Sequence, residues 1–281
     1  RLSNSSVLHP LWDLMDDMCA LKSIEVVDKS GGHEDQAITT IMPHTTHWSR
    51  LRCRCHQPVP VAEELLKLRK AFEKLRLAMV SWSKFVPVVL LKQLFEAGVE
   101  AKIGCTHCEV SVFFCDIDDF KGLCEGYSPR EVLRLLEVVL TQIYEALTEH
   151  SGTLLEFIGD EVLAIFNAPQ HVSEHARCAV TAALDAQERL SKLHGLPPVR
   201  IRCSVHKAQV LTGNIGSPTR MKYGALGDGV NLAARLKSLN TRYGTHLLVS
   251  DESLDFNDAH QRFVTRPVGR LVLKGRTTPT L

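Results

Sequence analysis

The chain has 281 residues, enough for one domain of ordinary size and a smaller one. Apolar residues make up 44% and charged residues 23%, as in a globular protein, and the formal net charge of +1 provides no broad basic face for nucleic acid. The chain begins at Arg1, which suggests a fragment or processed product, and no run approaches the roughly eighteen apolar residues of a membrane span.

The nine cysteines indicate a reducing compartment. Their number is odd, their spacing is not that of a small disulfide scaffold, and several fall in predicted strands or helices. Two clusters together offer enough zinc ligands but match no regular zinc module, so unpaired thiols near loops are the favoured interpretation: Cys53-Arg54-Cys55-His56 and Cys105-Thr106-His107-Cys108. We expect a cytoplasmic domain of a membrane-anchored protein, whose anchor lies outside this chain.

Residues 1–60 are predicted to be a linker. The stretch from about Gly31 to Pro60 is rich in His, Thr, Arg and Pro and shows no apolar period. A short helical stretch opens at Pro10, and with a second helix near Glu63 it resembles a HAMP-type linker, the two-helix signalling module that often follows a membrane span. That resemblance implies a sensor and a transmembrane segment before the first residue.

Residues 61–100 are predicted to be helical. Apolar side chains recur here at alternating steps of three and four, which is the pattern of a coiled-coil seam between two chains: Leu65, Leu68, Phe72, Leu75, Met79 and Trp82. An amphipathic helix packed on its own domain is the alternative, because only about three heptads are present.

Residues 105–281 show a series of strand, helix, hairpin, helix, hairpin and helix. A near-continuous buried strand ends at Asp116, and a capping box at Ser128 opens a helix. Two apolar strands, 154–158 and 162–166, follow as a hairpin with a tight acidic turn.

The alternation continues to the end of this region. A helix is predicted from Ser173 to Leu193, and a second hairpin from Val199 to Ile215. This order predicts an α+β fold, a ferredoxin-like βαββαβ sandwich, preceded by a helical, coiled-coil-forming linker.

Two carboxylates stand at the ends of predicted strands. Asp116 leaves the first strand and Asp160 occupies the tip of the following hairpin, so neighbouring strands would bring them together. Paired carboxylates at turns suit magnesium, which completes its octahedron with water and phosphate oxygens. A single aspartate at a strand end is more often a turn former or a helix cap, and only the pair indicates a metal-phosphate site.

A helix that opens near Gly227 carries a second polar pair. Leu232 and Leu236 form its apolar face, whereas Asn231 and Arg235 are four residues apart and share another face. An amide and a guanidinium there suit a ribose and a phosphoryl group. A solvated helix face with no function is the alternative.

Four blocks of sequence stand in a fixed order along this region: Phe113-Phe114-Cys115-Asp116-Ile117-Asp118-Asp119-Phe120, Phe157-Ile158-Gly159-Asp160, Gly213-Asn214-Ile215-Gly216-Ser217 and Gly227-Asp228-Gly229-Val230-Asn231-Leu232-Ala233-Ala234-Arg235. They resemble the signature blocks of class III adenylate and guanylate cyclases. The resemblance covers roughly residues 109–274, and the segment from Lys84 to Gly98 resembles the entry helix of membrane-linked members.

The resemblance implies a metal site and a reaction. Asp116 and Asp160, assisted by the carbonyl of Ile117, are implied to bind two Mg²⁺ or Mn²⁺ ions per active site. The implied reaction is in-line attack of the 3′-hydroxyl on the α-phosphorus with loss of pyrophosphate, which serves intracellular signal transduction.

The resemblance also implies the residues that hold the substrate. Asn231 would position the ribose, Arg235 would stabilise charge on the α-phosphate, and Lys274 would hold the terminal phosphates. Phe120 and Lys121 lie in the loop through which the phosphates approach.

Members of this family form head-to-tail dimers. One chain supplies the metal ligands, and the other supplies the base, ribose and phosphoryl contacts. Because this chain holds both sets, we expect an active homodimer with its active sites at the interface, and the coiled-coil seam agrees with that expectation.

Two positions bear on the choice of purine. Glu156 stands where ATP-using cyclases usually carry Lys. Guanine presents two adjacent donors that a carboxylate accepts together, whereas adenine presents a bare N1 acceptor that Glu would repel. The second base-reading position falls at Gly224, which has no side chain. GTP is therefore the predicted substrate, with ATP or dual use as the alternative. Glu156 could also be an ordinary charged residue at a strand edge with no role in recognising the base.

Several features depart from the family pattern or leave other functions open. Asp119 adds negative charge near the triphosphate, which Lys121 would offset, and His206-Lys207-Ala208 stands where relatives often have His-Thr-Gly. A catalytically silent dimeric regulatory module is one alternative. A polymerase-like phosphoryl transferase is another, disfavoured because no basic groove is indicated.

Overall fold

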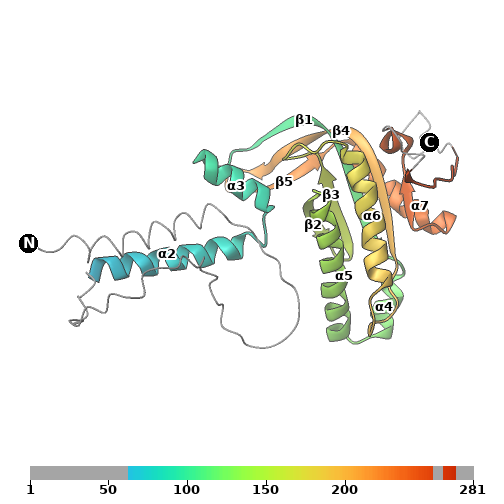
Figure 1. Cartoon of the computed structure of the whole chain (residues 1–281), viewed down its shortest axis with the longest axis horizontal. Helices are drawn as coiled ribbons and strands as arrows, with labels where there is room; N and C mark the ends of the chain where they lie inside the picture. Colours follow the sequence, from blue (N-terminus) through green and yellow to red (C-terminus); the bar gives the residue numbers. More distant parts are fainter. Residues whose placement is uncertain (1–62, 256–261, 270–281) are drawn as a thin grey trace, which may run out of the picture. The chain divides into compact units, whose positions relative to one another are not determined.

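The computed structural model describes residues 63–255 and 262–269 (Figure 1). The chain divides into two compact units, Arg1–Lys84 and Phe85–Leu281. The linker predicted over residues 1–60 lies outside the described residues. Within the described ranges, no helix combines the length and the apolarity that a membrane crossing requires.

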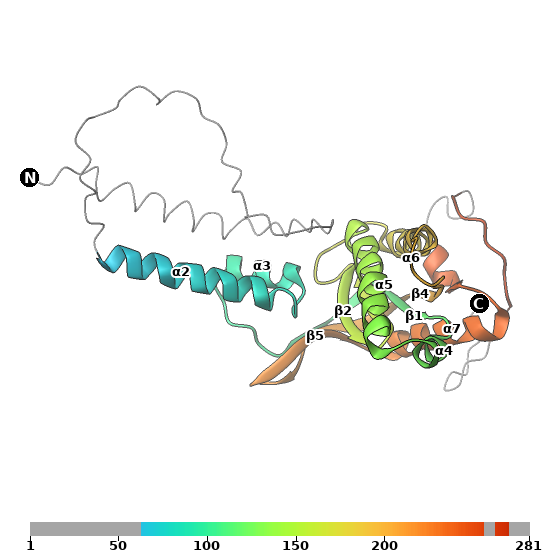
Figure 2. The ribbon, with the colours of Figure 1, turned by 90° about the horizontal axis from the view of Figure 1, so that it is seen from below.

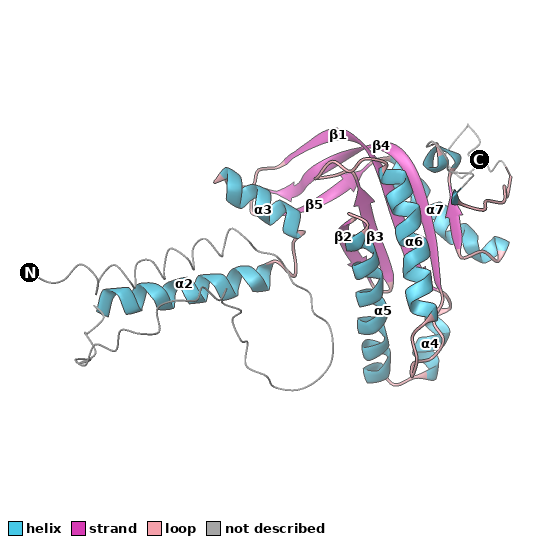
Figure 3. Ribbon diagram, viewed as in Figure 1, coloured by secondary structure: helices cyan, strands magenta, loops and turns pink. Residues whose placement is uncertain are grey.

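The second unit is an α+β fold on a single sheet, as the sequence predicts (Figure 3). The strands are β1 (Gly104–Ile117), β2 (Thr153–Ile158), β3 (Glu161–Phe166), β4 (Ile201–Ser217), β5 (Arg220–Leu226) and β6 (Leu247–Val249). The helices are α3 (Val88–Ala97), α4 (Phe120–Gly126), α5 (Pro129–Glu149), α6 (His175–Ser191), α7 (Asp228–Tyr243) and the short 3₁₀ helix Asp251–Leu254. The first unit contributes α2 (Glu63–Trp82).

The sheet has the strand order β2-β3-β1-β4-β5, and β6 joins it beside β4. The β4–β6 pair is parallel and the other pairs are antiparallel. β1, α5, β2, β3, α6 and β4 form the predicted βαββαβ series, and β5, α7 and β6 extend it.

β1 separates two cores because its side chains alternate between the faces of the sheet. Phe113, Cys115 and Ile117 face the larger core, which α5 and α6 cover. Val112 and Phe114 face the smaller core, to which α7 contributes. Figure 2 shows α6 and α7 on opposite sides of β1 and β4, so the end of β1 lies between two helical layers.

The predicted start of α5 is observed. The Ser128 hydroxyl accepts from the backbone N–H of Glu131, and the Glu131 carboxylate accepts from the backbone N–H of Ser128 across 2.9 Å. These reciprocal bonds form a capping box. The Ser128 hydroxyl also donates to the Glu131 carboxylate across 2.6 Å, and this bond, together with the one from the Ser128 backbone N–H, lowers the pKa of Glu131. The helix then buries one side in the larger core through Leu135, Val139, Ile143, Ala146 and Leu147.

The hairpin predicted from Val199 to Ile215 is wrong. That segment belongs to one long strand, β4, and the turn lies beyond it at residues 218–219, where β5 begins to pair back. Gly213 does not turn the chain. Its φ of 153° favours glycine, and a Cβ there would collide with the carbonyl oxygen of Gly104 in β1.

The cluster Cys105-Thr106-His107-Cys108 lies in the first residues of β1, directly after the coil segment 99–103. Cys105 is exposed and Cys108 is partly buried. The six cysteines of the described residues are free thiols. The second cluster, from Cys53 to His56, lies outside the described residues.

α2 and α3 occupy the segments where helices are expected. Along α2, Leu68, Leu75 and Trp82 are 43%, 47% and 58% exposed, and Phe72 and Met79 are half-buried, so the described residues leave much of this seam uncovered. Pairing of two chains through it stays a prediction. α3 ends at Gly98, whose φ of 61° is the left-handed conformation of a helix stop.

We predict that Gly213→Ala destabilises the domain by about 1–3 kcal/mol, because the new Cβ meets backbone that cannot move without breaking the β1–β4 ladder. The free energy of unfolding in urea measures this. Gly104→Ala is the matched control, since a Cβ at Gly104 meets no atom within 4 Å. Equal effects of the two substitutions would contradict the close-approach explanation.

Candidate functional site

The structure brings Asp116 and Asp160 together at one corner of the sheet. Asp116 is the penultimate residue of β1, and Asp160 lies in the tight turn between β2 and β3. Because β3 pairs antiparallel with β1, that turn reaches the carboxyl end of β1. There the backbone N–H of Ile117 donates to Oδ2 of Asp160 across 3.2 Å. Gly159, with a φ of 66°, permits the turn.

Asp116 is buried and is held by two cations. The residue is only 7% exposed. Arg202, directly opposite it in β4, donates Nε to Oδ1 and Nη2 to Oδ2, each across 2.9 Å. Nζ of Lys237 in α7 lies 2.8 Å from Oδ2. A carboxylate withdrawn from water requires such partners, because an unpaired buried charge costs several kcal/mol.

Both cations also contact a second carboxylate. Nζ of Lys237 lies 2.6 Å from Oε1 of Glu161, the first residue of β3. Nη1 of Arg202 lies 3.5 Å from Oδ1 of Asp118 and also donates to the hydroxyl of Thr241. The side chain of Lys237 is 6% exposed and that of Arg202 is 19% exposed, so these charges are solvated mainly by the carboxylates and only slightly by water.

The corner carries an excess of negative charge. Two cationic side chains, Arg202 and Lys237, meet four carboxylates: Asp116, Asp118, Asp160 and Glu161. Burial raises the pKa of Asp160, and the charges of Asp116 and Glu161 raise it further, against the opposing effect of backbone N–H bonds. The neighbours of Asp160 therefore disfavour its ionised form, and an added cation would relieve that repulsion.

The oxygen atoms at this corner fit magnesium or manganese. Asp116 and Asp160 offer carboxylate oxygens and Ile117 offers a backbone carbonyl, which are hard ligands. Across residues 63–255 and 262–269, no group of three or more His, Cys, Asp or Glu is arranged to hold a metal.

Asn231 and Arg235 lie on a different side of α7 from Lys237. A helix advances about 100° per residue, so Arg235 stands about 200° around the axis from Lys237 and about 40° from Asn231. Because Lys237 contacts Asp116, the side that carries Asn231 and Arg235 faces away from the Asp116 corner of the same chain. One chain therefore presents the two halves of the predicted site in different directions.

Glu156 is engaged by a lysine that sequence reasoning missed. Nζ of Lys222 lies 2.6 Å from Oε2 of Glu156, and the two side chains are 61% and 40% exposed. Lys222 and Gly224 are two residues apart in β5, so they emerge on the same side of that strand. β2 and β5 stand at the two ends of the strand order. The ion pair thus links Glu156 to the strand that carries Gly224, the other position predicted to contact the base, and no local sequence pattern indicates that contact.

Phe120 and Lys121 begin α4 and are not part of an open loop. Phe120 packs against the larger core. Lys121 is exposed, and its Nζ lies 3.8 Å from a carboxylate one turn further along the helix. Asp119 accepts from the N–H of Gly122 and caps the helix. Lys274 lies outside the described residues.

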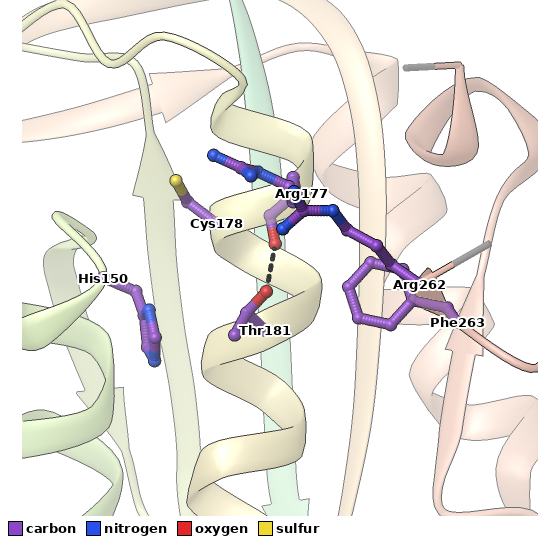
Figure 4. A pocket seen from close by; sticks show the side chains of 6 residues that line it. All are labelled: His150, Arg177, Cys178, Thr181, Arg262 and Phe263. Carbon is purple, nitrogen blue, oxygen red and sulfur yellow. Dashed lines mark hydrogen bonds between the residues drawn. The ribbon is translucent and has the colours of Figure 1, made fainter. Parts of the chain in front are cut away.

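Two hollows elsewhere on the second unit contain none of the predicted site residues. One is lined by His150, Arg177, Cys178, Thr181, Arg262 and Phe263, which Figure 4 shows around one side of α6. The other, of about 560 Å³, is lined mainly by apolar residues of α5, of α6 and of the segment before β4. Neither hollow is our candidate for the substrate site.

Known proteins resemble this chain in sequence and in fold. The family model described as the adenylate and guanylate cyclase catalytic domain matches residues 105–281. Adenylate cyclase 1 of Rhizobium meliloti (strain 1021) is 34% identical over 221 residues, which cover 76% of this chain and 33% of that protein. The chain thus spans about a third of that relative's length.

Two solved structures resemble about two thirds of the chain. The guanylyl cyclase Cya2 is 29% identical with a TM-score of 0.54, and the match covers 63% of this chain and 91% of Cya2. A bacterial light-regulated adenylyl cyclase has a TM-score of 0.61 at 23% identity, with 68% of this chain and 57% of that chain covered, which shows a shared fold.

We predict that Arg202→Gln destabilises the domain by about 2–4 kcal/mol, because it removes two charge-assisted hydrogen bonds from the buried Asp116 carboxylate. Chemical denaturation at fixed protein concentration measures this. Lys192→Gln is the control. It breaks an ion pair with Glu188 whose side chains are 69% and 64% exposed, and should change stability by less than about 0.5 kcal/mol. If Arg202→Gln left the free energy of unfolding unchanged, the stability of the buried Asp116 carboxylate would not depend on Arg202.

Proposed function

The chain belongs to the family of adenylate and guanylate cyclase catalytic domains, and on that premise we propose that it converts a purine nucleoside triphosphate, preferentially GTP, to the 3′,5′-cyclic nucleotide and pyrophosphate. The 3′-oxygen forms a bond to the α-phosphorus, the bond to the bridging oxygen of the β-phosphate breaks, and the 3′-hydroxyl proton passes to solvent. The observation that supports this function best is the buried Asp116 beside Asp160 at one corner of the sheet.

Asp116, Asp160 and the carbonyl of Ile117 are the residues that would hold Mg²⁺ or Mn²⁺. When bound, divalent cations lower the pKa of the attacking hydroxyl and neutralise the phosphates. Arg202 and the β1–β4 ladder hold the Asp116 carboxylate in place before any ligand arrives. The family resemblance implies two cations per site. Arg202 and Lys237 already contact the oxygens of Asp116 that such cations would bind.

Asn231 and Arg235 would act on a substrate bound at the corner of a second copy of the chain. The amide suits the ribose hydroxyls, and the guanidinium suits the equatorial oxygens of the α-phosphoryl group as charge develops there. Their direction on α7, away from Asp116 of the same chain, supports completion of each site in trans. A head-to-tail homodimer then holds two complete sites.

Glu156 and Lys222 would read the base together. The Glu156 carboxylate suits the N1–H and the exocyclic amine of guanine, and the Lys222 ammonium suits O6 on the same edge. Gly224 has no side chain, and Lys222 emerges on the same side of β5, so the lysine can supply the contact that Gly224 lacks. This complementarity supports GTP as the preferred substrate.

ATP is the second candidate. The relative in Rhizobium meliloti is named an adenylate cyclase, and adenine also offers one donor and one acceptor to a Glu–Lys pair, in the reverse order. We further propose that the intact protein is a membrane-anchored signalling protein whose cytoplasmic part includes this chain.

Purified protein with Mn²⁺ or Mg²⁺ should form cyclic GMP from GTP with a kcat/KM at least about tenfold above that for ATP. Glu156→Lys should reverse the preference. Lys222→Met should lower kcat/KM for GTP about tenfold, because it removes a charged donor from O6. Coupled detection of pyrophosphate and chromatography of the products measure all three.

Lys192→Met, an exposed lysine outside the proposed site, should match the parent protein in this assay. Higher turnover of ATP than of GTP by the parent protein would replace the GTP proposal with the adenylate cyclase alternative. No product from either nucleotide with either metal would favour the silent regulatory module.

Mixed dimers test completion of the site in trans. Asp160→Asn and Arg235→Ala should each lower kcat at least about a hundredfold when expressed alone. Coexpressed in equal amounts, they should recover about a quarter of the parent activity, since half of the dimers are mixed and each mixed dimer has one intact site. Coexpression of Asp160→Asn with Asp116→Asn is the control and should recover nothing. Absence of recovery in the first mixture would exclude shared sites.

A further inference from the structure

Lys237 places an ammonium group beside Asp116, at the corner of the sheet where the family resemblance implies divalent cations. Its residue is 5% exposed, and its Nζ lies between two carboxylates, 2.8 Å from Oδ2 of Asp116 and 2.6 Å from Oε1 of Glu161. It is therefore a buried ammonium held between two carboxylates, not a solvated lysine.

The acceptor sites of Asp116 limit how many cations it can bind. A carboxylate has about four lone-pair sites on its two oxygens. Nε and Nη2 of Arg202 take one site on each oxygen, and Lys237 takes the second site on Oδ2. About one site remains, on Oδ1. A carboxylate that bridged two divalent cations would have to release one of these partners.

The charge at the corner gives the same limit. The four carboxylates, Asp116, Asp118, Asp160 and Glu161, exceed the cationic pair Arg202 and Lys237 by two formal charges. One divalent cation balances that surplus. A second would leave the protein side of the site positive before the triphosphate contributes its own charge.

We propose that the Lys237 ammonium takes the position and the charge of one of the two divalent cations, so that each site binds a single Mg²⁺ or Mn²⁺ through Asp160 and the remaining acceptor of Asp116. The inference rests on the proposed function for the identity of the metal site. An ammonium is a compact point charge with three donors, which suits this replacement better than a planar guanidinium. Lys237 then fixes the position of the Asp116 carboxylate through the contact of its Nζ with Oδ2.

The test counts Mn²⁺ ions per bound nucleotide by equilibrium dialysis with metal analysis. Purified full chain is saturated with Mn²⁺ and 3′-deoxy-GTP, which lacks the attacking hydroxyl and cannot be cyclised, and a parallel series uses 3′-deoxy-ATP. The parent protein should retain one Mn²⁺ per nucleotide. Lys237→Gln and Lys237→Met should retain two. Lys237→Arg keeps the charge and should retain one.

Two Mn²⁺ per nucleotide in the parent protein would overturn the proposal. A single Mn²⁺ per nucleotide in both Lys237→Gln and Lys237→Met would also overturn it. Lys237→Gln is expected to fold, because Asp116 keeps its bidentate bond with Arg202 and Glu161 is 38% exposed. Circular dichroism and the dimer mass verify folding. Arg242→Gln, an exposed cation on the same helix, is the control for a loss of charge and should bind metal as the parent does.

Binding of Mn²⁺ alone separates this proposal from the proposed function. Without nucleotide, loss of the competing ammonium in Lys237→Gln should lower the Mn²⁺ dissociation constant at least about tenfold, measured from the electron paramagnetic resonance signal of free Mn²⁺. An unchanged constant would overturn the role of Lys237. Failure of the parent protein to retain either nucleotide would instead contradict the proposed function, and the comparison with Mn²⁺ alone would still decide the role of Lys237.

Discussion

The buried carboxylate of Asp116 is the constraint on which the rest of the site depends. A charge that is 7% exposed requires nearby cations, and its two partners, Arg202 and Lys237, come from β4 and α7. The same contacts that satisfy the charge therefore fix one end of β4 and the rotation of α7 about its axis. Since Asn231 and Arg235 share that helix, the ion pairs of Asp116 also determine the direction in which these two proposed substrate contacts point.

The alternation of β1 explains why Asp116 meets α7 and not α5 or α6. Val112 and Phe114 face the smaller core, and Asp116 continues that side of the strand toward Lys237. Ile117, one residue later, turns into the larger core, which leaves its backbone N–H near Asp160. A one-residue change of register would exchange these roles and put the carboxylate into an apolar layer.

The sequence predicts those parts of the fold and site that depend on local signals. The capping box at Ser128, the period of the helices and the tight turn at Asp160 specify their elements, and the adjacency of Asp116 and Asp160 follows from strand ends. The partners of these carboxylates depend on strand register and helix rotation, which only the folded chain determines. The hairpin predicted from Val199 to Ile215 is wrong for a related reason: the length of β4 depends on its pairing with β1, including the close approach at Gly213, and no local sequence signal reports that pairing.

The two-sided use of α7 has a consequence for signalling in the proposed dimer. One side of the helix holds Asp116 of its own chain through Lys237, and a different side carries Asn231 and Arg235, which the proposed dimer would direct to the site of the partner. A small rotation of α7 would then loosen the metal side of one site and misplace the phosphoryl contacts of the other at once. Because packed interfaces move between discrete arrangements, both sites would switch together. The domain could thus be regulated without any ligand entering the active site.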